Sequence, residues 1–156
     1  MRRGALFLLV VFAFCKSPQP GASRTSSLPG HGAISISVVP NPIVAQHISG
    51  DTYEFPFDVV VRETGGRSVT VSRVTVDVYG PAGVRLASVA WDAASIASNG
   101  YSTNLPANGE RRYHFNPRKS VPSDSVFNGT RAEVRVDAYD ETGTPASATT
   151  VVTATK

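Results

Sequence analysis

The sequence predicts an all-β protein, folded as a single antiparallel β-sandwich of about seven strands. Two long runs with apolar residues at alternate positions lie between Tyr53 and Tyr79, and this is the period of a strand that is buried on one face. Turn signals recur about every 8 to 15 residues. No long stretch has the period of a helix, so a sandwich of short strands is the fold class that the pattern favours.

The first run covers residues 53–61. Its apolar residues occupy every second position: Tyr53, Phe55, Phe57, Val59 and Val61. We expect these side chains to face the core and the residues between them to face solvent. Pro56 cannot donate a hydrogen bond to a neighbouring strand, so the run is predicted to have a free edge or a bulge there.

The second run begins after a turn at Gly65-Gly66. Val69 and Val71 alternate, but the next alternating valines are Val74, Val76 and Val78, so the alternation changes parity at Ser72-Arg73. One extra residue in a strand reverses the face of everything beyond it, which predicts a bulge or a strand break at this point.

The remaining strands are expected at residues 34–39, 84–90, 111–115, 130–140 and 146–155, with the last two forming a hairpin. Residues 116–129 are predicted to be a long polar loop. Residues 91–98 fit either a helical turn or an irregular crossing.

The N-terminus has the features of a signal peptide over residues 1–15. A basic start at Arg2-Arg3 precedes a ten-residue apolar segment, which is too short to span a bilayer. The segment 12–15, Phe-Ala-Phe-Cys, resembles a bacterial lipoprotein box, and this resemblance implies lipidation at Cys15, although the family prefers a small residue in place of Phe14. Ordinary cleavage near Ser23 is the alternative.

Residues 16–32 are rich in Ser, Pro and Gly and are predicted to be a disordered tether, which leaves residues 33–156 as the domain. The chain is therefore expected to be exported, as a membrane-anchored lipoprotein or as a periplasmic or secreted protein. A lipid at Cys15 would be its only contact with the membrane.

Charge and motifs exclude several classes of function. The 156 residues carry a formal charge of +3, but four of the 15 cations precede residue 31, so the domain has 11 cations against 12 anions. Such a balance disfavours nucleic-acid binding. His31, His47 and His114 do not have metal-ligand spacing, and no nucleophile motif occurs. Asp137, Asp140 and Glu141 suit an ordinary acidic turn better than a calcium loop.

We therefore predict no catalytic, cofactor-binding or metal-binding residues, and no enzyme activity. The strand rhythm, the β-rich middle and the final hairpin, VRVDAYDETG, resemble immunoglobulin-like or fibronectin type III-like domains of bacterial envelope proteins. This likeness implies a non-catalytic interaction or structural module that binds another envelope protein or a surface polymer.

The partner is expected on the outer face of the strands at 73–79 and 131–139, which such a fold makes antiparallel neighbours. Asp77 would approach Arg131 or Arg135, and Arg73 would approach Asp137 or Tyr139, giving a ladder of opposite charges. The candidate partner-binding residues are Arg73, Asp77, Tyr79, Arg135, Asp137 and Tyr139.

A small carbohydrate-binding domain is the alternative function. It would need two or three aromatic side chains on one exposed face, and Trp91, Tyr79, Tyr101 and Tyr139 are the candidates. We interpret Trp91 as a residue that caps the core.

Overall fold

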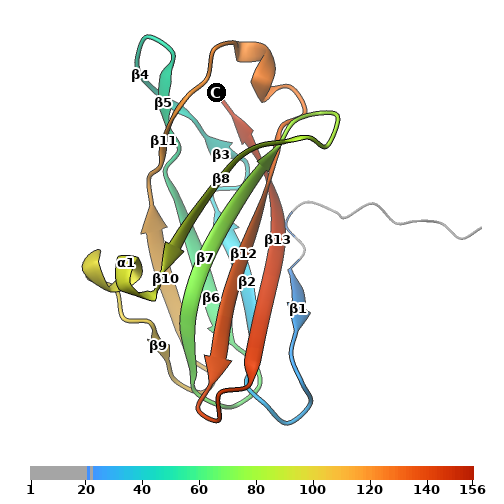
Figure 1. Ribbon diagram of the computed structural model, residues 1–156, viewed down its shortest axis with the longest axis vertical. Helices are drawn as coiled ribbons and strands as arrows, with labels where there is room; N and C mark the ends of the chain where they lie inside the picture. Colours follow the sequence, from blue (N-terminus) through green and yellow to red (C-terminus); the bar gives the residue numbers. More distant parts are fainter. Residues whose placement is uncertain (1–20, 22) are drawn as a thin grey trace, which may run out of the picture.

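Seven strands of six or more residues form the frame of the protein in the computed structural model, which describes residue 21 and residues 23–156 (Figure 1). They are β2 (Ile34–Val39), β6 (Phe57–Glu63), β7 (Val69–Tyr79), β8 (Arg85–Asp92), β10 (Glu110–Phe115), β12 (Arg131–Asp140) and β13 (Pro145–Thr155). The prediction of an all-β sandwich with about seven strands is confirmed.

Shorter elements complete the described chain. They are β1 (Arg24–Ser26), β3 (Ile43–Val44), β4 (Gln46–Ser49), β5 (Thr52–Glu54), α1 (Ala93–Ser98), β9 (Asn104–Leu105), β11 (Arg118–Ser120) and the 3₁₀ turn η1 (Asp124–Phe127). Within residues 21 and 23–156, no helix has the length and apolar character needed to cross a membrane.

The long strands form two facing layers. The large sheet has the order β1-β13-β12-β7-β8, and the sheet that faces it has the order β10-β6-β2. Strands β4, β5 and β11 form a third, small sheet, which Figure 1 shows at the end of the molecule near the C-terminus. One pairing departs from the expected antiparallel pattern, because β3 runs parallel to the end of β13.

The core lies between the two layers and consists of the alternate residues that the sequence predicted. Val59, Val61, Val134 and Val136 are fully buried, and Phe57 is 2% exposed. Within β6 and within β12, one outward-facing residue separates each of these buried residues from the next. Burial on one face therefore accounts for the alternating pattern.

The run at 53–61 divides into two strands. It breaks at Phe55-Pro56, so that β5 pairs with β4 and β11 while β6 belongs to the sheet of β10 and β2. Tyr53 is buried as expected, but in a second apolar cluster with Ala45 and Val121. The missing N–H of Pro56 thus coincides with a change of sheet.

The parity change in β7 is a bulge, as the sequence indicated. Arg73 is opposite Asp137 of β12, whereas Val71 is opposite the adjacent Ala138, which leaves Ser72 as the extra residue. Val71 and Val74 are both fully buried on either side of it. The bulge therefore lets β7 keep one apolar face along 11 residues.

Two connecting segments are more regular than the sequence suggested. The predicted loop at 116–129 contains β11, which pairs with β5, and the turn η1. Residues 93–98 form helix α1, because the Asp92 carboxylate caps it by accepting the N–H of Ser95 at 2.8 Å. Ile96 of this helix is fully buried against the sheets.

The predicted tether at 16–32 needs correction over its described part. Arg24, Thr25 and Ser26 form β1 and pair with Thr149, Ala148 and Ser147 of β13. Short polar residues can form an edge strand when a longer strand supplies the hydrogen-bond partners, and composition alone does not reveal this. The signal peptide at 1–15 and the lipidation candidate Cys15 lie outside the described residues.

Candidate interaction surface

The outer face of β7 and β12 carries the predicted partner-binding residues, and the two strands are antiparallel neighbours. Arg73 lies directly opposite Asp137, as expected. Asp77 lies opposite Glu133, so that Arg131 and Arg135 occupy the diagonal positions. The structure thus brings together the predicted residues of this face, but in a register that the sequence did not resolve.

The charges on this face are paired in ways other than a simple ladder. Asp77 binds the Arg85 guanidinium of β8 at 3.4 Å, and Asp137 binds Arg135 of its own strand at 2.7 Å. A hydrogen bond from Arg135 to Asp137 raises the pKa of that guanidinium. Each pair is exposed enough to contribute no more than about 1 kcal/mol to stability, which leaves the charges available to a partner.

The two tyrosines stand at opposite ends of the β7–β12 ladder. Tyr79 lies under the Arg131 guanidinium, which is 5.7 Å from the centre of the ring, and Tyr139 is 45% exposed. We call this outer face, defined by Arg73, Asp77, Tyr79, Arg135, Asp137 and Tyr139, the charged face. A mixed-charge surface with an exposed tyrosine is suited to specific recognition of a protein.

A regular ion-pair ladder occurs on the opposite layer, between β6 and β10. Arg62 binds Glu110 at 2.6 Å, and Asp58 binds both Arg112 and His114 at 2.8 Å. The Arg112 hydrogen bond, opposed by partial burial and assisted by His114, lowers the pKa of Asp58 below its usual range. The sequence analysis placed a ladder of opposite charges on the strands that became β7 and β12, whereas these cross-strand pairs lie between β6 and β10.

An open hollow of about 280 Å³ lies beside this ladder. Val39, Val44 and Pro56 supply apolar walls, and Asp58 and His114 supply a polar rim. The two rim groups, Asp58 and His114, already bind each other.

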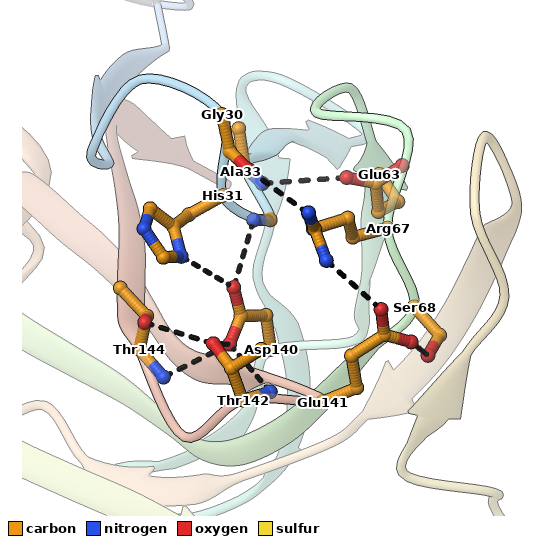
Figure 2. Close-up of polar contacts among 11 residues, drawn as sticks. Gly30, His31, Ala33, Glu63, Arg67, Ser68, Asp140, Glu141, Thr142 and Thr144 are labelled. Atoms are coloured by element: carbon orange, nitrogen blue, oxygen red, sulfur yellow. Dashed lines mark hydrogen bonds and ion pairs between the residues drawn. The ribbon is translucent and has the colours of Figure 1, made fainter.

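Two buried carboxylates organise the end of the sandwich where the β12–β13 hairpin turns (Figure 2). Glu63 is 2% exposed and accepts backbone N–H groups from Gly65 at 2.6 Å, Asn108 at 2.8 Å, Gly66 at 2.9 Å and Ala33 at 3.3 Å. Burial acts to raise the pKa of Glu63, but these four hydrogen bonds outweigh it and the net pKa is lowered.

The second carboxylate, Asp140, is also 2% exposed. It accepts the Thr142 hydroxyl at 2.6 Å and the N–H groups of Thr142, Thr144 and Gly32, and it binds His31 at 3.1 Å. The Thr142 hydroxyl, against the opposing effect of burial and with help from the N–H groups, holds the pKa of Asp140 far below its ordinary value. Figure 2 shows His31, Thr142 and Thr144 around the Asp140 carboxylate.

Both carboxylates hold loops in place, and the sequence analysis did not recognise either. Glu63 is followed by Gly65 and Gly66, and a Cβ at Gly65 would collide with the backbone of His31 and Ala33. A carboxylate just before paired glycines was the available signal for such a backbone-binding role.

The acid dependence of stability tests the role of Asp140. Its pKa is lowered on folding, so its contribution is complete above the unfolded pKa of about 4 and is lost as the pH falls through the folded pKa. We expect the urea midpoint of the wild-type protein to fall steeply as the pH drops below about 4. Asp140→Asn should have a lower midpoint at pH 7 and should depend less on pH in the acid range. Parallel pH profiles for the two proteins would contradict this role.

The aromatic residues considered for carbohydrate binding do not gather on one surface in the described chain. Trp91 stacks on Phe115 with ring centres 4.1 Å apart, and Tyr101 packs edge-on against Tyr113 at 5.8 Å. Both therefore pack against the core, as interpreted for Trp91. Tyr79 and Tyr139 remain on the charged face, at opposite ends of the ladder.

Comparisons with known proteins support the fold. The chain matches no protein-family profile, and it matches no curated protein. Among solved structures, a structural genomics consortium target has a TM-score of 0.52 with 10% identity, over 81% of this chain and 84% of the other. This likeness concerns the fold alone.

Two further structures are more distant. The putative ApaA protein from Bordetella pertussis has a TM-score of 0.44 and 13% identity, over 90% of this chain and 99% of the other. The CARDB domain of a Pyrococcus furiosus protein has a TM-score of 0.36 and 14% identity, over 80% and 95%.

Proposed function

We propose that the chain is an exported, non-catalytic module that binds another protein of the cell envelope through the charged face. The observation that carries the proposal is the arrangement of that face, where paired but exposed charges lie on the interior strands β7 and β12 and Tyr139 is exposed at one end of their ladder. Exposed tyrosine and arginine side chains are common anchors of protein interfaces.

The arrangement of the titratable groups supports a non-catalytic role. The buried carboxylates of Glu63 and Asp140 are engaged by backbone N–H groups and are held in their charged form, which suits anchoring rather than proton transfer. The basic and apolar leader at residues 1–15 supports export. The separation of the aromatic residues gives the carbohydrate-binding alternative less support than a protein partner.

Cross-linking from defined positions tests the proposal. A photo-reactive amino acid at Tyr139 of the tagged full chain, in its own cell, should yield an adduct with one discrete protein. The same group at Val60, a half-buried position on the outer face of β6, should not. A diffuse adduct that resists protease would indicate a surface polymer and overturn the choice of a protein partner.

Charge reversal gives the quantitative test. Arg135→Glu should reduce the Tyr139 adduct about tenfold, because reversing a charge at an interface opposes the complementary charge of the partner. Arg62→Glu is the matched control, since Arg62 is also an exposed arginine in an ion pair but lies on the opposite layer. Equal effects of the two reversals, with both proteins folded, would count against the charged face.

A further inference from the structure

Strand β8 forms one margin of the large sheet (Figure 1). It pairs with β7 along one side, and no other strand of the described chain pairs with its second side. The strand is eight residues long, and its charged residues, Arg85 and Asp92, stand at its two ends. A long, unpaired and mostly uncharged strand edge is a template for a further strand.

The other margins of the two main layers are better protected. Four of the six residues of β10 are Glu110, Arg111, Arg112 and His114, and such a run of charged or ionisable side chains discourages pairing with another chain. Strand β1 is three residues long. On β2, the Ser23 hydroxyl accepts the free N–H of Ile36 at 3.2 Å. Strand β8 is therefore the least protected of these four margins.

Apolar side chains are exposed along this same margin. Leu86 is 53% exposed, and Val84, just before the strand, is 63% exposed. Val89 and Trp91 pack against the core but remain partly open to solvent. A strand placed beside β8 would cover this surface, so the margin offers both hydrogen bonds and apolar contacts.

We infer that β8 pairs antiparallel with β8 of a second copy of this chain, which joins two large sheets into one continuous sheet. The charge pattern favours this occupant: antiparallel self-pairing brings the cationic start of each strand to the anionic end of the other, at both ends of the ladder. This inference does not depend on the protein partner proposed for the charged face.

The faces of the strand restrict the register. Residues that are opposite each other in an antiparallel ladder point to the same face of the sheet. Ser88 and Ala90 lie opposite Asp77 and Thr75 and share their outward face. Any two-fold axis that passes through a residue satisfies this condition, and an axis through Val89 does so with Ser88 opposite Ala90 of the second copy.

We choose the axis through Val89 because it also brings together the oppositely charged ends of the two strands. It places Asp92 of one copy beside the irregularity at Arg85 and Leu86 of the second copy, where the β7–β8 register shifts. The side chain of Arg85 is 61% exposed, so its guanidinium can reach a second carboxylate in addition to Asp77.

Substituting lysine at Ser88 tests this pairing. The full chain, as the producing cell processes it, should show a concentration-dependent monomer–dimer equilibrium in sedimentation velocity. Ser88→Lys puts two like charges beside the two-fold axis and should raise the dissociation constant of the dimer at least about tenfold. Ser37→Lys is the control, because Ser37 is also an exposed serine on the outward face of a marginal strand, β2.

Tryptophan fluorescence locates the contact. Trp91 is the sole tryptophan and lies in β8, so its emission should shift to shorter wavelength as wild-type protein and Ser37→Lys associate, and Ser88→Lys should require a higher concentration for the same shift. A protein that stays monomeric, a dimer unaffected by Ser88→Lys, or association without a change at Trp91 would each overturn the inference.

Discussion

Replacement of Phe57 by alanine is expected to lower the free energy of unfolding by about 3–5 kcal/mol. Phe57 is 2% exposed, and its ring lies 5.7 Å from that of Phe115 and 6.5 Å from that of Trp91. Loss of the ring would leave a cavity where the two layers meet, and the rigid strands on both sides limit how far it can collapse. Urea denaturation followed by circular dichroism measures the effect.

Val60 provides the matched control for Phe57. It lies in the same strand on the opposite face and is only half-buried, so Val60→Ala should cost about 1 kcal/mol or less. Similar shifts of the urea midpoint in the two variants would show that the inward and outward faces of β6 have been assigned incorrectly.

Replacement of Glu63 by alanine is expected to destabilise the protein by about 3–5 kcal/mol, because it leaves several backbone N–H groups without an acceptor. Those groups come from three separate loops, at Ala33, Gly65-Gly66 and Asn108, so the loss also loosens the end of the sandwich. Hydrogen exchange of these amides should accelerate more than exchange in β12.

Two further variants test whether the effect comes from the acceptor oxygens of Glu63 and whether it is specific to this buried glutamate. Glu63→Gln keeps one oxygen acceptor and should cost less than alanine, about 1–3 kcal/mol. Glu110→Ala removes an exposed glutamate of a surface ion pair and should cost no more than about 1 kcal/mol. If Glu63→Ala were as mild as Glu110→Ala, the carboxylate would not be an anchor of the loops.

The fold was predictable because apolar side chains at alternate positions indicate which face of a strand is buried. Alternation identified the inward face of β6 and β12, and the parity change in β7 identified the bulge at Ser72. The pairing of the short segments was not predictable. Residues 24–26 and 118–120 are exposed and polar, and only the strands beside them make them regular.

The register of distant strands and the role of buried polar groups were also beyond the sequence. The short turn after Asp140 fixes how β12 meets β13, but β7 and β12 are separated by a long stretch of chain, so no local geometry sets Asp77 against Glu133. Glu63 and Asp140 are acidic residues beside turns, where such residues are common and usually exposed. Their burial depends on loops that come from elsewhere in the chain.

The pairing of β1 with β13 has a mechanical consequence. The N–H of Gly21 binds the carbonyl of Val151, and Arg24 to Ser26 continue along β13 away from its C-terminal end, before the chain turns back into β2. Tension applied through the preceding residues would peel these hydrogen bonds one after another, since unzipping loads each bond in turn. The buried strand β2, with Ile34 and Ile36, would feel the load only afterwards. Strand β1 would therefore yield to such a pull before the core does.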